Sequence, residues 1–207
     1  MTRVSGVILA GGQATRMGGG DKGLLRLDDR MLIEHVIARI APQVSTLVLN
    51  ANGDPARFSE FGLPVISDSA EGFAGPLAGV LAGLDWASEQ GNDTIVTVAA
   101  DTPFFPTNLV TVMSDVRAKA GTPLVMASTQ GPGIGQHRHP TFGLWPVALR
   151  EDLRRSLRDG LRKVVDWTDK HGCATAEFPV IGYDQFFNVN NPQDLESARL
   201  LLRKVYE

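Results

Sequence analysis

The chemistry that the sequence offers is concentrated in a glycine-rich segment near its start. The apolar run 7–10 leads into residues 11–23, which contain six glycines together with Arg16 and Lys22. Glycine lets the backbone approach a ligand closely and adopt positive φ values. Exposed amide N–H groups and two side-chain cations suit a polyphosphate. The segment therefore predicts a site for a nucleoside triphosphate.

Two common phosphate-binding motifs do not fit this segment. A Walker loop has Gly before its lysine and Ser or Thr after it, whereas Asp21 precedes Lys22 and Gly23 follows it. The dinucleotide fingerprint needs three glycines in a G-x-G-x-x-G register, and residues 11–16 lack the second and the third. The segment is either a plain structural turn or a different phosphate-binding loop, and its density of cations favours the loop.

The elements that must position this loop alternate between strand and helix patterns. Apolar and β-branched runs predict strands at 4–10, 46–49, 64–66, 94–98, 124–127, 141–144 and 176–180. Helical spacing predicts helices at 31–40, 77–87, 107–119, 147–157, 161–169 and 194–205. This alternation predicts an α/β fold, a Rossmann-like three-layer α/β/α arrangement around a mainly parallel, mixed sheet. We expect one domain over residues 1–207, with residues 130–136 forming an exposed loop.

Polar residues stand at the ends of the predicted strands. The glycine-rich segment follows the first strand, Asn50 the second, Asp68 the third and Asp101 the fourth. A ligand of a parallel sheet binds beyond the carboxyl ends of its strands, so we expect these groups to converge. The Asp101 carboxylate is suited to Mg²⁺, although Asp is also a common helix cap or turn residue. A plain turn role at a strand end is equally open to Asn50 and Asp68.

Composition narrows the class of protein. The chain has 207 residues and a formal net charge of −3, which argues against broad binding to nucleic acid. Cys173 is the single cysteine, as is usual in a reducing compartment. No apolar stretch is long enough to cross a bilayer. We therefore expect a cytoplasmic protein with neither a nucleic-acid nor a membrane partner.

The pattern L-A-G-G-x-x-x-R-M-G-x-x-D-K over residues 9–22 resembles the signature of the nucleotidyltransferase superfamily, which activates sugar phosphates and cofactor precursors. Within that superfamily, the whole chain resembles the molybdenum cofactor guanylyltransferases. The further segments that carry the resemblance are 50–52, Asp68 with 75–79, 101–103, 139–145, 159–164 and 188–192. The resemblance implies a fold of the nucleotide-diphospho-sugar transferase type, with a nucleotide-binding half (1–110) and an acceptor-binding half (111–207).

The resemblance also implies which residues serve the nucleotide. The implied nucleotide-binding residues are Leu9, Ala10, Gly11, Gly12, Lys22, Asn50, Asp68, Gly75, Pro76 and Asp101. The implied catalytic residues are Arg16, Lys22 and Asp101, with Lys22 along the phosphates and Arg16 on the β- and γ-phosphates that leave. Mg²⁺, or Mn²⁺ in its place, is implied on Asp101 and Asn190. Asparagines before a helix are usually caps, so the ligand role of Asn190 rests on the resemblance.

The acceptor-binding residues that the resemblance implies are His139, Arg162 and Asn188. Arg162 belongs to a basic run (154, 155, 158, 162 and 163) that is either a solvated helix face or a receiver for an anionic pterin phosphate. His137 and His139 can point to one side of a strand, but no third metal ligand has a recognisable spacing to them. A solvated loop or a substrate contact is therefore favoured there over a metal site.

The implied reaction transfers GMP from GTP to the terminal phosphate of molybdenum-bearing molybdopterin and releases diphosphate. No protein nucleophile is needed, because the acceptor phosphate is already ionised, so the protein must position the partners and neutralise charge. The alternative enzymes are a CTP-dependent molybdopterin cytidylyltransferase and a sugar-phosphate nucleotidylyltransferase. The non-enzymatic alternative is a guanine-nucleotide-binding assembly factor. The implied partners are GTP, molybdopterin, a molybdenum-inserting protein and molybdoenzyme chaperones.

Overall fold

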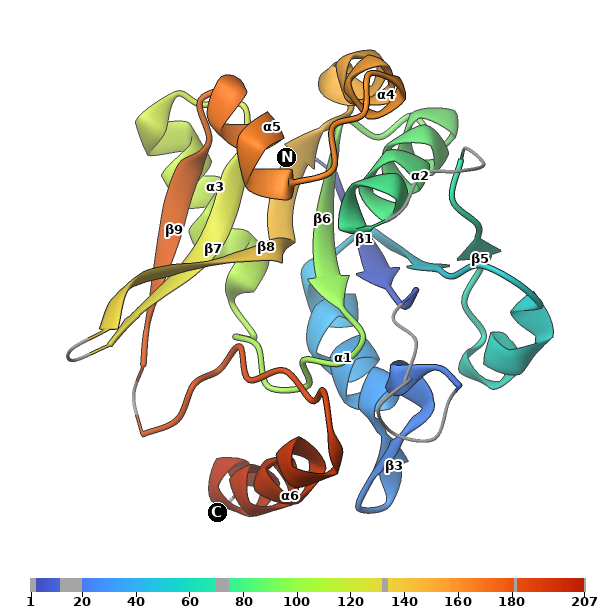
Figure 1. The fold of residues 1–207 in the computed structure, drawn as a ribbon, viewed down its shortest axis with the longest axis vertical. Coiled ribbons are helices and arrows are strands. Elements are labelled where there is room, and N and C mark those ends of the chain that lie inside the picture. The colour runs from blue at the N-terminus through green and yellow to red at the C-terminus, as the bar shows by residue number, and fades with distance from the viewer. Residues whose placement is uncertain (1–2, 12–19, 70–74, 132–133, 181, 207) are drawn as a thin grey trace.

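A seven-stranded sheet forms the centre of the protein in a computed structural model, which describes residues 3–11, 20–69, 75–131, 134–180 and 182–206. The strands lie in the order β5-β4-β1-β6-β8-β7-β9 (Figure 1). Their bounds are β1 (Val4–Leu9), β4 (Thr46–Asn50), β5 (Val65–Ile66), β6 (Thr94–Ala99), β7 (Val125–Gly131), β8 (Ile134–Pro146) and β9 (Ala174–Pro179).

The strands on one side of the sheet run parallel to one another and end at the same level. β1 pairs in parallel with β4 and β6, and β4 pairs in parallel with β5. β6 is buried along its whole length, as expected for a β-branched strand that is covered on both faces. In this register Leu9 lies opposite Asn50 in one neighbour and opposite Ala99 in the other. The segments that follow these strands therefore all begin at one edge of the sheet.

The other side of the sheet contains the strands that make it mixed. β8 runs antiparallel to both β6 and β7, whereas β9 pairs in parallel with β7. The Trp145 indole on β8 donates from Nε1 to Thr97 Oγ1 on β6 at 2.9 Å, which satisfies both buried polar groups. The predicted mainly parallel, mixed sheet is therefore confirmed.

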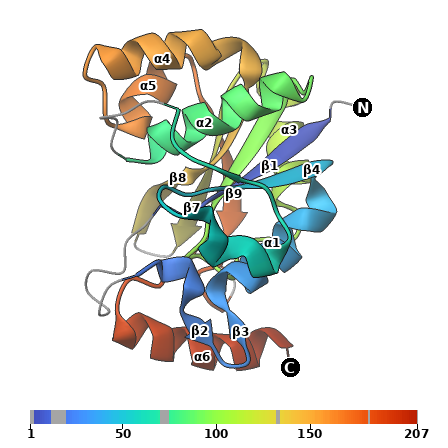
Figure 2. The same ribbon diagram turned by 90° about the vertical axis from the view of Figure 1, so that its right-hand side faces the viewer.

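Helices cover both faces of the sheet. The bounds of the helices on one face are α2 (Pro76–Glu89), α4 (Arg150–Arg158) and α5 (Val164–Lys170), and those on the other are α1 (Leu32–Ile40) and α3 (Leu109–Ala120). Figure 2 shows α2, α4 and α5 above the sheet and α1 below it. Alternation along β1 produces this division, because Val7 packs with the first group and Ile8 with the second. The sheet is thus the middle of three layers, as the sequence predicted.

A further apolar cluster lies beyond the end of β6. It joins the C-terminal helix α6 (Pro192–Tyr206) to a hairpin of β2 (Arg26–Leu27) and β3 (Arg30–Met31), which lie side by side in both views (Figures 1 and 2). Val189, just before α6, is fully buried in this cluster. Its backbone N–H donates to the carbonyl of Asp101 at 2.9 Å. The segment that precedes α6 is therefore held against the residues that follow β6.

Most predicted elements are confirmed with shifted bounds, but the prediction of a loop at 130–136 is wrong for the residues of this range that the structure describes, although residues 130, 135 and 136 are exposed as expected. β7 continues to Gly131 and β8 begins at Ile134, and these two residues face each other in the ladder. β8 is also longer than the strand predicted at 141–144, since its first part, which includes His137, pairs with β7. This part carries polar side chains, so it offers no apolar alternation from which a strand can be recognised.

Short elements were missed because they are shorter than any window in which hydrophobic periodicity can be read. They are the β2–β3 hairpin and the 3₁₀ helices η2 (Lys22–Leu24), η3 (Ala41–Gln43) and η4 (Pro55–Phe61). The helix predicted at 147–157 is divided into a 3₁₀ turn, η5 (Val147–Leu149), and α4, and the one predicted at 161–169 is shortened to α5. None of the helices in the described part of the chain has the length and apolarity to span a bilayer.

Candidate functional site

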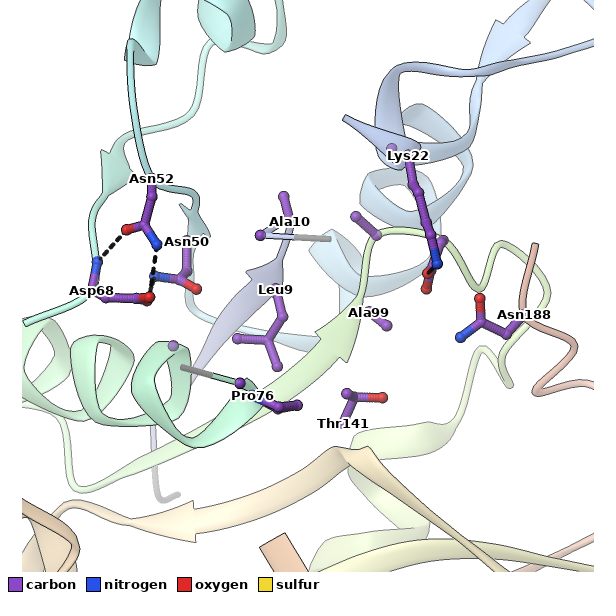
Figure 3. Close-up of a pocket in the computed structure, with 16 residues that line it drawn as sticks. Leu9, Ala10, Lys22, Asn50, Asn52, Asp68, Pro76, Ala99, Thr141 and Asn188 are labelled. Atoms are coloured by element: carbon purple, nitrogen blue, oxygen red, sulfur yellow. Dashed lines mark hydrogen bonds and ion pairs between the residues drawn. The ribbon is translucent and has the colours of Figure 1, made fainter. Parts of the chain in front are cut away.

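A pocket of about 470 Å³ lies where the polar segments converge. Figure 3 shows it at the carboxyl ends of β1 and β6, with Asn50, Asn52 and Asp68 at one end and Lys22 and Asn188 at the other. The pocket lies here because the parallel strands end at the same level, which brings together the segments that follow them. The two ends of the pocket differ in chemistry.

At one end, a carboxylate is held between two side-chain amides. Asp68 Oδ1 accepts from Asn50 Nδ2 at 3.0 Å, and Asp68 Oδ2 accepts from Asn52 Nδ2 at 2.7 Å. The Asp68 N–H donates to Asn52 Oδ1 at 2.9 Å (Figure 3). Asn50 is buried as the last residue of β4, so the sheet fixes its position. These amides and the carboxylate form a fixed set of donors and acceptors that suits the polar edge of a nucleobase or the hydroxyls of a ribose.

At the other end, Lys22 bridges two oxygen-bearing side chains from distant parts of the chain. Its Nζ donates to Asn190 Oδ1 at 2.6 Å and lies 3.4 Å from Asp101 Oδ2. The side chains of Lys22 and Asp101 are only 20% and 13% exposed. Burial raises the pKa of the Asp101 carboxyl, and the Lys22 ammonium opposes that rise. The Lys22 ammonium therefore favours the ionised form of this carboxyl, in opposition to its burial.

The Asn190 side chain contacts Lys22 because the next residue, Asn191, caps the N-terminus of α6. Asn191 Oδ1 accepts from the Asp194 N–H at 2.9 Å. The Asp194 carboxylate in turn accepts from the backbone N–H groups of Asn190 and Asn191. The ordinary helix-capping role thus belongs to Asn191, which leaves the side chain of Asn190 to point at Lys22.

The first turn of α2 forms part of the pocket. Gly75, immediately before the helix, adopts φ 97°, a value that glycine accepts without strain. Pro76 follows at the first helical position, where it leaves no N–H unpaired. Gly75, Pro76 and Gly79 all line the pocket. Because the N-terminal end of a helix carries partial positive charge, this turn favours a phosphate group.

Asp101 and Asn190 have the chemistry to hold a divalent cation. Both offer oxygen, the ligand that Mg²⁺ and Mn²⁺ prefer, and both already contact one cationic group, the Lys22 ammonium. Within the described residues, no group of three or more His, Cys, Asp or Glu side chains is placed to hold a metal. The pair therefore suits a cation that takes its remaining ligands from a bound phosphate chain and water.

The pocket brings together the described residues that the sequence analysis assigned to a nucleotide. Those that line it are Leu9, Ala10, Gly11, Lys22, Asn50, Asp68, Gly75, Pro76 and Asp101. Asn188, which was assigned to the acceptor, lines it as well. Gly12 and Arg16 lie outside the described residues.

Several lining residues had no role in the sequence analysis, among them Asn52, Gly79 and Thr141. Asn52 stands two positions after Asn50, a spacing that keeps two side chains on one side of an extended chain, and this signal was available. Gly79 is one turn into α2, where a Cβ atom would lie 2.3 Å from Asn50 Oδ1. Thr141 comes from β8, whose place beside β6 no local pattern reveals.

His139 is not among the described residues that line this pocket. It is 9% exposed, its ring stacks on Phe186 with 4.3 Å between centroids, and its Nε2 lies 3.0 Å from Thr129 Oγ1. Burial is the main cause that lowers the pKa of His139, to about 4. The imidazole is therefore neutral at physiological pH and is part of an aromatic cluster.

Arg162 lines a separate, open cavity of about 510 Å³, together with Lys163 and Lys170. Its guanidinium donates to the backbone carbonyls of Leu157 and Leu161. The structure thus places this basic group apart from the pocket that holds Lys22.

Two arginines of the same basic run are paired along α4. Arg154 Nη2 lies 2.5 Å from Asp85 Oδ1 on α2, and Arg155 Nη2 lies 3.5 Å from Asp152 Oδ2 one turn earlier. Arg154 therefore joins α4 to α2, whereas the 72% exposed side chain of Arg155 lies on a solvated helix face. Neither residue is among those that line the pocket of Lys22.

The chain matches the family model described as MobA-like NTP transferase domain over residues 6–173. It is similar to a molybdenum cofactor guanylyltransferase from Bradyrhizobium sp. (strain ORS 278), at 49% identity over 97% of this chain and 93% of that protein. A protein of the same name from Mesorhizobium japonicum is 45% identical over 98% of this chain and 97% of its own length. The similarity thus extends along nearly the full length of each protein.

Solved structures share the fold at low sequence identity. Molybdopterin-guanine dinucleotide biosynthesis protein A from Archaeoglobus fulgidus matches with a TM-score of 0.73 at 22% identity, over 97% of this chain and 100% of that one. A putative glucose-1-phosphate thymidylyltransferase from Bacillus anthracis matches with a TM-score of 0.74 at 15% identity, over 97% and 95% of the two chains. The predicted nucleotide-diphospho-sugar transferase type of fold is therefore confirmed.

Gly79→Ala is expected to weaken the binding of a nucleoside triphosphate. The added Cβ would lie 2.3 Å from Asn50 Oδ1 and 2.8 Å from Leu9 Cδ2, so the Asn50 amide must turn away from Asp68. An Asn50 amide that is displaced in this way loses one hydrogen bond to the nucleotide, worth about 1 kcal/mol, which corresponds to a rise in Kd of about 5-fold. Isothermal titration calorimetry with GTP and Mg²⁺ measures this rise.

The matched control is Gly83→Ala, one turn further along α2. Its Cβ would lie 2.7 Å from Val7 Cγ2, which belongs to the core and not to the pocket lining. Overpacking of this kind costs about 1–3 kcal/mol of stability, so both variants are expected to melt at a lower temperature. A Kd for GTP that changes equally in the two variants would contradict the role given to Asn50.

His139 is expected to make the protein less stable in acid. Its pKa is about 4 in the folded protein, below the ordinary value of 6.5. Between these values only the unfolded chain binds the proton, so the free energy of unfolding falls as the pH falls through this window. In His139→Gln, about 2–3 kcal/mol of that fall should be absent. Urea unfolding at pH 7 and pH 4.5 measures it, and an identical pH dependence in both proteins would refute the assignment.

Proposed function

Since this chain belongs to the MobA-like NTP transferases and, within them, to the molybdenum cofactor guanylyltransferase family, we propose that it transfers GMP from GTP to the terminal phosphate of molybdenum-bearing molybdopterin. Diphosphate is the other product. The observation that carries the proposal is that Lys22, whose ammonium contacts Asp101 and Asn190, lines the same pocket as Asn50 and Asp68. This arrangement suits a ligand with a polar base at one end and a phosphate chain at the other.

The residues of the pocket have separate tasks in this reaction. Asn50 and Asp68 bind the guanosine end, where a carboxylate and an amide match the N–H edge and the carbonyl of guanine. The Lys22 ammonium lies along the phosphates and offsets the charge that develops as diphosphate leaves. Arg16, which lies outside the described residues, is proposed to hold the departing β- and γ-phosphates. The acceptor phosphate is its own nucleophile, so the protein supplies position and charge, and no covalent intermediate forms.

We propose that Asp101 and Asn190 would hold Mg²⁺, or Mn²⁺ in its place. The donor chemistry of these two side chains supports this proposal, since both present oxygen to a cationic group. When bound, the ion would neutralise part of the phosphate charge. Asp101, buried and held by Lys22, keeps its carboxylate in place for that purpose.

The acceptor is proposed to bind through residues of the C-terminal part. Asn188 lines the pocket and supports this role directly. Arg162 lines the second cavity, apart from the pocket of Lys22, together with Lys163 and Lys170 but also with Asp159 and Asp166. Its role in binding the acceptor therefore stays a prediction. His139 has the least support, because its ring is buried. The division into a nucleotide-binding half (1–110) and an acceptor-binding half (111–207) stays a prediction.

The cellular setting is part of the same proposal. We propose that the protein acts in the cytoplasm, which the single cysteine, Cys173, supports. Direct transfer of the labile pterin from a molybdenum-inserting protein, and onward to molybdoenzyme chaperones, stays a prediction.

The experiment that tests the function measures diphosphate release with each of the four nucleoside triphosphates, Mg²⁺ and molybdenum-loaded molybdopterin. The expected result is turnover with GTP and formation of the guanine dinucleotide. Turnover with CTP alone would identify a cytidylyltransferase, and turnover only with a sugar phosphate would identify the other transferase. GTP binding without diphosphate release, in the presence of acceptor, would favour the assembly factor.

Asp101→Asn is expected to abolish most turnover without unfolding the protein. The amide has the size of the carboxylate but no charge, so kcat should fall by about 100-fold or more. Stability should be equal or higher, because burial already disfavours the ionised carboxyl, as its raised pKa shows. Asp85→Asn is the control, since it removes a 23% exposed carboxylate that pairs with Arg154 outside the pocket. Unchanged kcat in Asp101→Asn at saturating Mg²⁺ would overturn its role.

A further inference from the structure

Arg57 is fixed in place from several directions, although no motif in the sequence singles it out. It lies in η4, where its Nε contacts Asp21 Oδ2 at 2.5 Å and its Nη2 lies 3.4 Å from Asp21 Oδ1. Its other guanidinium hydrogens go to the carbonyls of Asn52 and Asp54. The guanidinium carbon also lies 4.7 Å from the centre of the Phe58 ring, which is fully buried. A planar guanidinium held in this way has little freedom to move.

The partner of Arg57 is the residue immediately before Lys22. Asp21 has a side chain that is only 16% exposed, and its carbonyl accepts from the Leu24 N–H at 3.1 Å, which forms the 3₁₀ turn η2. Gly23, in the middle of that turn, packs so closely that an added Cβ would lie 3.1 Å from the Cβ of Ala100. The turn is thereby seated on the end of β6, and the ion pair with Arg57 fixes its first residue.

Arg57 also contacts the end of the pocket opposite to Lys22. Its Nη2 donates to the carbonyl of Asn52, and the Asn52 side chain bonds to Asp68 through both its amide nitrogen and its oxygen. Arg57 therefore joins the rigid cluster around Asp68 to the turn that carries Lys22.

We propose that Arg57 is a positioning residue that holds Asp21 and thereby directs the Lys22 ammonium onto the phosphates of the nucleotide. The inference rests on the proposed function in one respect, that Lys22 contacts phosphate. Asn52 and Asp68 bond directly to each other. We therefore expect the end of the pocket assigned to the base to keep its hydrogen bonds when the guanidinium is removed.

The test compares Arg57→Ala with Arg154→Ala, which breaks a similar ion pair away from the pocket. The exposed fractions of the side chains are 27% and 16% for Arg57 and Asp21, and 20% and 23% for Arg154 and Asp85. Both variants are expected to lose some thermal stability. Binding of GTP and of GMP with Mg²⁺ is then measured by calorimetry, together with kcat and KM for GTP.

If Arg57 positions Lys22, its removal should weaken the binding of GTP, which has three phosphates, more than the binding of GMP, which has one. Arg57→Ala should weaken GTP binding by about 10-fold and GMP binding by less than about 2-fold, whereas Arg154→Ala should change neither. In a Lys22→Ala background, Arg57→Ala should weaken GTP binding by less than about 2-fold further, because its effect passes through Lys22. Arg57→Lys, which keeps the charge but not the fork, should recover part of the loss.

Asp21→Asn provides the same test from the other partner, and it decides the matter if Arg57→Ala does not fold. It should reproduce the selective loss of GTP binding, since an amide cannot form the ion pair. If wild-type protein binds GTP and both variants behave as Arg154→Ala does, this inference is overturned and the proposed function stands. If wild-type protein binds no GTP, both are overturned.

Discussion

The parallel register of β4, β1 and β6 is the constraint on which the site depends. Leu9 lies between Asn50 and Ala99, and the ladder continues one residue further on each side, since the Ala10 N–H donates to the Asn50 carbonyl and the Ala100 N–H to that of Leu9. Three segments therefore leave the sheet at the same level. Close packing fixes this register, because a slip of one residue would turn each side chain of β6 to the opposite buried face, against a different set of helices.

The same edge holds a charge that burial disfavours. Asp101 lies at the end of the most buried strand, and its carboxyl has a raised pKa. The ammonium that opposes this effect belongs to Lys22, 79 residues away in the sequence, and Lys22 in turn contacts Asn190 at a separation of 168 residues. Such a cluster forms only when the chain has folded. The helix α6 and the β2–β3 hairpin therefore contribute to the site, because they hold Asn190 within reach of Lys22.

The two ends of the pocket are built in different ways. The Asn50–Asp68 end is built from residues at or just after the sheet, with amides and carboxylate bonded to one another. The Lys22 end depends on a short 3₁₀ turn and on the segment before α6, which are held by side chains. Arg57 connects the two ends through Asn52 and Asp21. The Asn50–Asp68 end is thus held by the sheet, and the less regular Lys22 end is fixed relative to it. This arrangement suits the alignment of phosphates against fixed groups.

The sequence was sufficient to predict features that depend on neighbouring residues, but not features that depend on contacts between distant residues. The alternation of strand and helix patterns predicted the α/β class, and the residues at strand ends predicted Asn50, Asp68 and Asp101, because strand direction alone places those ends together. Short or polar elements escaped prediction. The β2–β3 hairpin and the first part of β8 bury too little in a periodic way to leave a pattern.

The sequence by itself determined which groups are available at the edge, since buried strands and the residues that end them are local properties. Only the tertiary structure decided which of them meet. Segments that are distant in the chain come together in the contact of Lys22 with Asn190 and in the ion pair of Arg57 with Asp21. The burial of His139 likewise depends on the packing of distant segments. No local pattern encodes such a contact, because it depends on how the layers pack and on where α6 and β8 come to lie.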